Sequence, residues 1–529
     1  MSEHGIISIV PPLLAILFAV LTRQAIVSLF LGIWAGGVIY TGGFGLAQAF
    51  NWIITGIADE FHATIIVFTF FLGAGVAFVW RLGGSYAVRD WALERLDTQR
   101  KVGVAAWALG LLVFFDDYAN TAIVGSTVKD VSDELRVSRE KLSYIVDSTA
   151  APVATIAISS WVAFQLSLIG DGYEAAGVTD HPPVFEIFLN SIPFNMYSLL
   201  AIVMVLVIVL SGRDYGEMLT AEHRSWQTGY VNREGARPMQ DVSESLGTPH
   251  AEEPRLVAFL GPIAVLIVAT LGSALWTGYA PGATLWDMVT TADYAAALVY
   301  GSFAMIVSGF VIGYAYNILT IGESIDTTID GFSIMLTAIS ILVLAWGIGE
   351  VVTALGTGEY VAGVAQQSIT PALLPAIILV LAAFIAFSTG TSWGTMGILT
   401  PIAIPVAWSL TGDHTMVAAV VGTIFSGAIF GDHTSPISDT TVLSSTFTGA
   451  DLIDHVRTQI YYAVTVAAVA ITLIVVWGYT RVTPLLLLPI GVVLLVGLVY
   501  GLSGWDARRR GLTPVASDQA REHEADEEE

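Results

Sequence analysis

Residues 371–410 read PALLPAIILVLAAFIAFSTGTSWGTMGILTPIAIPVAWSL, an apolar run that the polar stretch STGTSWGT interrupts at mid-length. One helix needs only about 20 apolar residues to cross the hydrocarbon core of a bilayer. The flanking loops 353–370 and 411–414 contain no Lys or Arg, whereas loops on the cytoplasmic side are enriched in both. The run is therefore predicted to enter the membrane from outside and to return there as a re-entrant hairpin.

A second interrupted run, residues 102–128, has the opposite surroundings. Basic residues lie on both sides of it: Arg81, Arg89, Arg95, Arg100 and Lys101 before it, and Lys129, Arg136, Arg139 and Lys141 after it. A single crossing would place one of these basic loops outside, against the distribution of Lys and Arg in membrane proteins. A hairpin that enters from the cytoplasm keeps both loops inside.

The composition requires a membrane protein around these hairpins. Of the 529 residues, 55% are hydrophobic and 12% are charged, whereas soluble domains carry about 25% charged residues. The formal charge of -24 disfavours nucleic-acid binding, and acidic loops suit a protein from a halophile, where salt screens their repulsion. The chain has no Cys, which excludes disulfides and thiolate metal sites.

Hydropathy predicts an all-α polytopic membrane protein with about 11 transmembrane helices plus two re-entrant hairpins. The expected crossings are 6–21, 25–41, 61–80, 144–169, 193–211, 256–277, 294–316, 332–352, 415–446, 458–478 and 484–502. Successive crossings alternate in direction. Counted from the two hairpins, they place the N-terminus outside and the C-terminus, after Arg508-Arg509-Arg510, in the cytoplasm.

Three weak matches in the same order divide the chain into two repeats. They pair Gly32-x-x-x-Gly36 with Gly309-x-x-x-Gly313, residues 82–87 with 355–361, and Asp147-Ser-Thr-Ala-Ala-Pro152 with Asp432-His-Thr-Ser-Pro436. Opposite hairpin polarity predicts inverted-topology repeats, as in many secondary transporters. The predicted parts are an N-terminal helix 1–24, the first repeat 25–211, a cytoplasmic linker 212–255, a connecting helix 256–293, the second repeat 294–480, a C-terminal helix 481–505 and a disordered acidic tail 506–529.

Polar residues gather at four places where the repeat predicts broken backbone. Prolines 152 and 436 are expected to open two of the crossings, because proline donates no backbone hydrogen bond. Ionisable groups at membrane depth imply partners or function, and their oxygens suit a hard cation such as Na⁺. The candidate ion- or proton-binding residues are Asp116, Asp117, Asn120, Thr121, Asp147, Thr149, Thr389, Thr391, Ser392, Asp432, His433, Thr434, Ser435, Asp439 and Thr440.

Four acids are the expected ligands of transported Na⁺: Asp117, Asp147, Asp432 and Asp439. A carboxylate removed from water beside others holds a proton more readily, so Na⁺ and H⁺ can compete for it. On a helix the adjacent Asp116 and Asp117 point about 100° apart, so one of them is expected to enter the site. The small hydroxyl residues could equally stabilise hairpin tips, and His433 could carry a proton or fix a carboxylate.

The run Gly431-Asp432-His433-Thr434-Ser435-Pro436-Ile437-Ser438-Asp439-Thr440-Thr441 resembles the NhaC family of sodium/proton antiporters. Residues 115–121 and 388–395 are similar to that family's other polar stretches, although Thr434 stands where family members often have Cys. The resemblance implies Na⁺/H⁺ exchange in the plasma membrane and kinship with elevator-type carriers. It implies no enzyme activity and no cofactor beyond the transported Na⁺ and H⁺.

Other functions and partners stay open. Relatives of this kind include carriers of small organic acids or amino acids coupled to Na⁺ or H⁺, although the four polar clusters contain no Lys or Arg to balance an anion. An intramembrane protease is disfavoured because Gly-x-Gly-Asp and Gly-x-Ser-Gly motifs are absent. The two GxxxG pairs favour close packing within the chain over the seam of a homodimer.

Overall fold

The computed structural model describes residues 4–22, 25–84, 86–87, 91, 95–114, 117–156, 159–238, 250–251, 253–356, 360 and 370–518. Regular structure in these ranges is entirely helical, as predicted. The predicted acidic tail from residue 519 onward and part of the predicted linker, residues 239–249 and 252, lie outside the described residues.

The described helices make a multi-pass membrane protein with fewer clear spans than the eleven predicted. Six helices are long and apolar enough to cross a bilayer: α4 (Glu60–Arg81), α14 (Val257–Thr277), α16 (Tyr294–Ala315), α22 (His414–Thr434), α24 (Leu452–Thr480) and α25 (Pro484–Arg510). The count reaches eight if two bent pairs are each one span: α2 (Ala25–Thr41) with α3 (Leu46–Ala58), and α10 (Val184–Ser191) with α11 (Met196–Ser211).

Broken helices account for part of the difference. The predicted crossing 144–169 consists of two short helices, α8 (Arg139–Ala154) and α9 (Ser160–Ala175). Pro152 lies inside α8 and does not open it, which corrects the prediction. Its missing N–H removes one bond to the preceding turn without unwinding the next residues, and the helix ends at Ala154.

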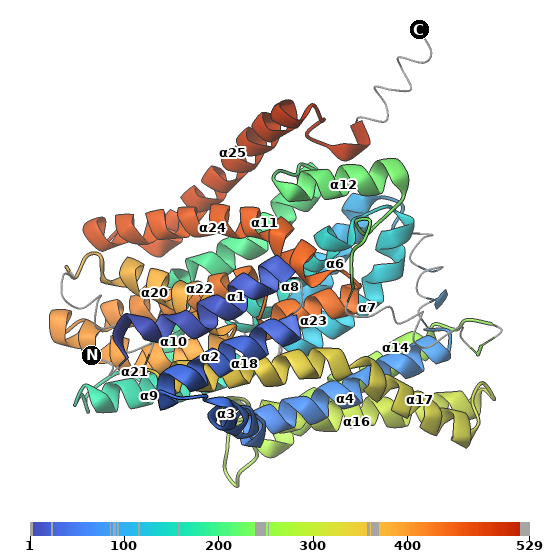
Figure 1. Ribbon diagram of the computed structural model, residues 1–529, viewed down its shortest axis with the longest axis horizontal. Coiled ribbons are helices and arrows are strands. Elements are labelled where there is room, and N and C mark those ends of the chain that lie inside the picture. Colours follow the sequence, from blue (N-terminus) through green and yellow to red (C-terminus); the bar gives the residue numbers. More distant parts are fainter. Residues whose placement is uncertain are drawn as a thin grey trace.

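Each predicted re-entrant hairpin consists of two helices. The first is α6 (Gln99–Leu112) with α7 (Asp117–Glu134), and the second is α20 (Leu374–Thr389) with α21 (Ser392–Thr411). The Gln99 side chain donates a 2.8 Å hydrogen bond to the carbonyl of Arg136, so the chain enters and leaves the first hairpin on one face. Figure 1 shows α6 and α7 toward one end of the molecule and α20 and α21 toward the other.

The two halves share an order of helices and a pattern of packing. Helices α2, α3, α4, α6, α7, α8, α9 and α11 are matched in order by α16, α17 (Ile321–Ile334), α18 (Leu336–Ala354), α20, α21, α22, α23 (Asp439–Thr448) and α24. Contacts correspond as well: α4 packs on α17 as α18 packs on α3, and α7 packs on α23 as α21 packs on α9. The division into two inverted-topology repeats stays a prediction.

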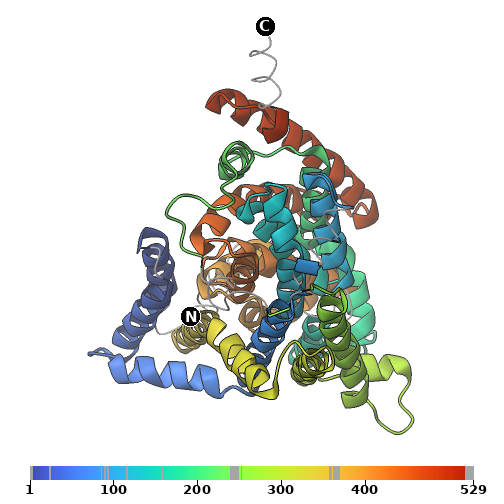
Figure 2. The same ribbon diagram turned by 90° about the vertical axis from the view of Figure 1, so that its right-hand side faces the viewer.

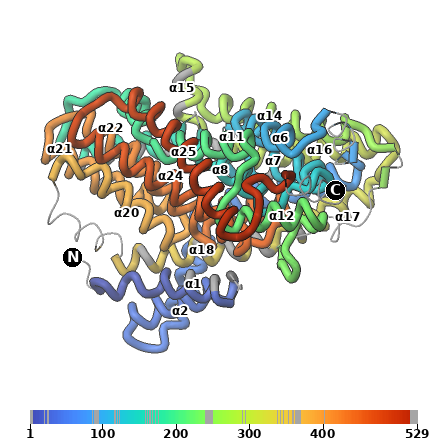
Figure 3. Tube along the Cα trace, turned by 90° about the horizontal axis from the view of Figure 1, so that it is seen from above, coloured from blue at the N-terminus to red at the C-terminus, as the bar shows by residue number. Residues whose placement is uncertain are grey.

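Small residues bring these helices together. A Cβ on Gly427 would lie 2.1 Å from the carbonyl oxygen of Leu379, so α22 and α20 approach closely there. The paired GxxxG glycines also pack within the chain; Gly36 faces Val351 and Gly309 faces Phe78. Figure 2 shows the orange helices α20–α23 at the centre of the bundle, and Figure 3 shows α1 (Val10–Thr22) and α2 along one side.

Ion pairs concentrate on one face, which carries α12 (Glu217–Thr228) and is called here the α12 face. Lys141 lies 2.7 Å from Asp214, and Arg224 lies 2.8 Å from Glu140. The segment that follows α25 reaches the same face, because His223 of α12 hydrogen-bonds to the carbonyl of Thr513 at 2.9 Å. The predicted linker is therefore packed against the bundle over its described residues.

Candidate ion-binding site

The site is built around the break between α22 and α23. Pro436 cannot donate a backbone hydrogen bond, and α22 ends at Thr434 while α23 begins at Asp439. The Ser438 hydroxyl caps α23 by accepting from the N–H of Thr441. The break thereby presents Asp432 from the last turn of one helix and Asp439 from the first turn of the next.

Hydrogen bonds connect this break to both predicted hairpins, and the first hairpin to α8. Tyr118 of α7 donates a 2.6 Å hydrogen bond to Asp439. The side-chain amide of Asn120 donates to the carbonyl of Thr149 at 3.1 Å. The Ser435 hydroxyl donates to the carbonyl of Phe387 at 2.9 Å. The first hairpin thus contacts both broken crossings, and the second hairpin contacts the break after α22.

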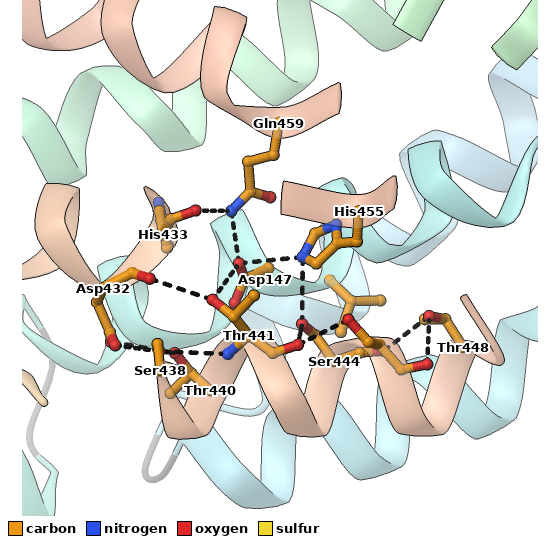
Figure 4. A network of polar contacts seen from close by, with 12 residues as sticks. Asp147, Asp432, His433, Ser438, Thr440, Thr441, Ser444, Thr448, His455 and Gln459 are labelled. Atoms are coloured by element: carbon orange, nitrogen blue, oxygen red, sulfur yellow. Dashed lines mark hydrogen bonds and ion pairs between the residues drawn. The ribbon is translucent and has the colours of Figure 1, made fainter. Parts of the chain in front are cut away.

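Asp147 and Asp432 lie in one network (Figure 4). The Thr441 hydroxyl lies 3.5 Å from the Asp147 carboxylate and 3.1 Å from the backbone carbonyl of Asp432. The Asp432 carboxylate accepts from Ser438 and, at 3.0 Å, from Thr440. Both aspartates are fully buried and come from different halves of the chain, and the Thr441 hydroxyl connects them.

The second helix after the break supplies the other partners of Asp147. Gln459 of α24 donates 2.6 Å and 2.8 Å hydrogen bonds to the Asp147 carboxylate and to the His433 carbonyl. The His455 imidazole contacts the same carboxylate oxygen of Asp147 at 3.4 Å. On its other side His433 hydrogen-bonds through Nδ1 to the Tyr197 hydroxyl at 3.2 Å.

Several polar atoms of this network have no hydrogen-bond partner among the described residues. They are Asp147 Oδ1, His433 Nε2, His455 Nδ1 and the Gln459 side-chain oxygen. A buried polar atom without a partner costs about 1–3 kcal/mol, and a charged one costs more. A carboxylate oxygen left in this condition is suited to a bound cation or proton.

The other two predicted acids lie beside this network. Asp439 accepts from Tyr118 and from the N–H of Thr440 at 2.9 Å. Asp117 accepts a 2.9 Å hydrogen bond from Trp161 of α9, whose ring contacts Trp393 of the second hairpin. Within the described residues, no three His, Cys, Asp or Glu side chains are grouped to hold a metal ion. The four predicted carboxylates are therefore not gathered around one point in this conformation.

Most of the predicted hydroxyl residues bond to backbone carbonyls. Thr391 instead caps α21, by accepting from the N–H of Gly394. The donors to carbonyls are Thr121 to Tyr118, Thr149 to Ile145, Thr389 to Ile385, Ser392 to Ala428 and Thr434 to Phe430. Asp116 lies outside the described residues.

Six residues of the site were absent from the predicted set: Tyr118, Ser438, Thr441, His455, Gln459 and Trp161. Ser438 and Thr441 belong to the run that carries the family resemblance, and Tyr118 follows Asp117 directly. His455 and Gln459 stand four residues apart, so a helix places them on one side. A polar pair at that spacing in an apolar helix was the available signal for them.

The sequence model of the Na⁺/H⁺ antiporter family matches residues 153–479. The chain belongs to this family. The resemblance to NhaC-type antiporters is thereby confirmed, and the protein is a transporter rather than an enzyme. Membership of this family sets aside the hypothesis of an intramembrane protease that the sequence analysis considered.

The names of similar proteins state different functions, or none. An uncharacterized protein of Haemophilus influenzae is 33% identical over 89% of this chain and 91% of its own length. An uncharacterized Na⁺/H⁺ antiporter of the same organism is 30% identical over 44% of this chain and 45% of its own. The malate-2H⁺/Na⁺-lactate antiporter of Bacillus subtilis is 30% identical over 35% of this chain and 37% of its own.

Proposed function

We propose that the protein exchanges Na⁺ for H⁺ across the plasma membrane, with inward proton movement driving Na⁺ out. The observation that carries this proposal is the Asp147 carboxylate, buried and with one oxygen lacking a hydrogen-bond partner among the described residues. Its partners among the described residues are Thr441, His455 and Gln459 rather than Lys or Arg, so we assign a transported cation or a proton as the charge that balances it. Competition of the two ions for one carboxylate is sufficient for exchange.

The ligands we assign to Na⁺ are Asp147 and Asp432 together with the hydroxyl of Thr441, which bridges them. Hard cations such as Na⁺ favour carboxylate, carbonyl and hydroxyl oxygens, and all three kinds lie in this network. Asp439 and Asp117 are proposed to join in another conformation of the cycle. The contact between Tyr118 and Asp439 supports this, because it already connects α7 to the break.

An elevator-type cycle in two inverted repeats follows as the proposed mechanism. The hairpins and broken helices would move as one unit, with Na⁺ bound in one direction and protons in the other. The matched packing of α7 on α23 and of α21 on α9 supports such a unit. The N-terminus is proposed to lie outside and the α12 face in the cytoplasm, where its basic residues fit the distribution of Lys and Arg in membrane proteins.

Reconstitution into liposomes tests the exchange. Purified protein is incorporated with a pH-sensitive dye inside, and a Na⁺ gradient is imposed in the absence of any organic solute. Proton movement that depends on Na⁺ alone is expected. Its absence, with intact insertion of the protein, would refute Na⁺/H⁺ exchange.

A second candidate is a carrier of a small organic acid or amino acid coupled to Na⁺ or H⁺. Similarity to the malate-2H⁺/Na⁺-lactate antiporter over part of the chain favours it. The same liposomes distinguish the two functions when malate, lactate or an amino acid is added. Proton movement that occurs only with an added solute would transfer the proposal to this candidate.

A further inference from the structure

A cavity of about 660 Å³ opens on the α12 face, away from the site just described. The first turn of α6, the start of α8 and residues 515–518 line it, and its charged lining residues are Asp97, Arg100, Lys101, Lys141, Asp214, Glu222 and Asp518. A volume of this size holds many water molecules, since one takes up about 30 Å³. Water on this face therefore reaches the start of α8.

Three charged side chains are buried at the wall of this cavity. Lys141 of α8 lies 2.7 Å from Asp214 and 3.2 Å from Glu222 of α12. Asp214 accepts a further hydrogen bond of 2.6 Å from the Tyr462 hydroxyl of α24. Burial raises the pKa of Asp214 to about 6, against the opposing effect of Lys141 and with a smaller contribution from Glu222. Asp214 can therefore change its protonation state near neutral pH.

Tyrosines connect this group to the candidate ion-binding site. The ring of Tyr462 contacts those of Tyr144 and Tyr215, with centroids 4.7 Å and 4.9 Å apart. Beyond them a narrow crevice is lined by Tyr144, Ser148, Tyr197, Gln459 and Tyr462. In this conformation the crevice leaves no room for a water molecule.

The far end of the crevice touches the buried acids. Gln459 donates to Asp147, and the Tyr197 hydroxyl bonds to His433. Polar side chains therefore extend from the cavity to Asp147 along one side of α8 and α24. On this route the crevice beside the tyrosines has no room for water in this conformation.

We propose that Asp214 is the group through which protons pass between the α12 face and Asp147. The proton leaves the carboxyl group of Asp147, crosses the crevice when it opens, and is accepted by the Asp214 carboxylate beside the Tyr462 hydroxyl. It then passes to water in the cavity, and Asp147 is left ionised to take up Na⁺. The inference rests on the proposed Na⁺/H⁺ exchange and adds a residue that none of the four polar clusters contains.

The competing interpretation is that Lys141, Asp214 and Glu222 only anchor α12 to α8. Two measurements on reconstituted protein separate the interpretations: proton movement driven by Na⁺, and exchange of isotopic Na⁺ for Na⁺ at equal pH. The second needs the ion-binding site and its motion but no net proton transfer. A proton-passing residue affects the first measurement alone, whereas an anchor affects both.

The variants are Asp214→Asn and the milder Tyr462→Phe, which removes only the hydroxyl that bonds to Asp214. Tyr215→Phe is the matched control, because its ring also contacts Tyr462 while its hydroxyl bonds to Thr465 at 2.9 Å. For Asp214→Asn we expect Na⁺-driven proton movement to fall about 10²-fold, the lower end for loss of a positioned proton-transfer group. Tyr462→Phe should give a smaller fall, and the control none.

The pH profile gives an independent readout. In the wild-type protein, Na⁺-driven proton movement should change with the pH of the α12 side around pH 6, and Asp214→Asn should lose this dependence. The charged and titratable groups that face Asp214 and stay in place in that variant are Lys141, Glu222, Tyr144, Tyr215 and Tyr462.

Each outcome decides between the interpretations. Equal losses of proton movement and Na⁺–Na⁺ exchange, or unchanged proton movement in both variants, would overturn the role of Asp214 while leaving the exchange intact. Absence of Na⁺-driven proton movement in the wild-type protein would overturn the exchange itself, and this inference with it.

Discussion

Replacing Gln459 with Met tests how the protein holds Asp147 ready for a cation. The amide of Gln459 donates to the Asp147 carboxylate at 2.6 Å and to the His433 carbonyl at 2.8 Å, and the residue is fully buried. Met has a similar length and no donor, so the variant removes both hydrogen bonds with little change in volume.

The magnitude follows from the bond to the charged group. A hydrogen bond to an ionised side chain contributes about 1.5–3 kcal/mol. Its loss disfavours ionised Asp147 relative to the protonated form by the same amount. Since about 1.4 kcal/mol corresponds to a factor of ten, the Na⁺ concentration for half-maximal exchange should rise about 10- to 150-fold at fixed pH.

The assay is Na⁺-driven proton movement in liposomes as a function of Na⁺ concentration. Gln165→Met is the matched control, because Gln165 is equally buried and its side-chain amide bonds to the Thr400 hydroxyl at 3.2 Å instead of to a carboxylate. The control should keep the wild-type Na⁺ dependence. A Gln459→Met protein with that same dependence would refute the role of the amide, as would an equal shift in both variants.

Three further predictions concern the site and the packing around it. Asp432→Asn should reduce Na⁺-driven proton movement to background in a protein that is still folded, as judged by elution from a sizing column; residual exchange would remove Asp432 from the mechanism. Lys141→Met leaves two buried carboxylates without their cation and should destabilise the protein by about 3–5 kcal/mol, which an unchanged unfolding temperature in detergent would contradict. Gly427→Ala should destabilise by about 1–3 kcal/mol through overpacking of α22 against α20. Gly501→Ala on α25, where nothing lies within 4 Å of the new Cβ, should not; equal thermal stability of these two variants would argue against the close approach.

Much of the architecture could be predicted from the positions of the charged residues in the sequence. The basic residues on both sides of 102–128 predicted that the chain returns to one face, and the bond between Gln99 and Arg136 agrees. The described residues contain six to eight candidate spans, so the predicted number of eleven crossings stays a prediction, and hydropathy does not register where a helix bends. Helices α2 and α3, for example, meet at 118°, and the apolar run alone gives no sign of that angle.

The site was predictable to the extent that its residues are acidic. Asp147 and Asp432 stand out because a buried charge in an apolar sequence is costly. Gln459 and His455 are uncharged, and their spacing of four residues is a weaker signal than a buried acid. Which hydroxyls serve the carboxylates also depends on geometry that spacing does not give. Thr440 and Thr441 contact the acids, whereas Thr434 bonds to the backbone of its own helix.

The most direct test of the central claim, that Na⁺ and H⁺ take turns at one buried pair of carboxylates, is calorimetric titration of the purified protein with Na⁺. Repeating the titration in buffers of different ionisation enthalpy measures the protons released on binding. The account predicts that Na⁺ binding releases protons and that Asp147→Asn abolishes both binding and release. Na⁺ binding with no proton release, or binding unaffected by Asp147→Asn, would contradict it.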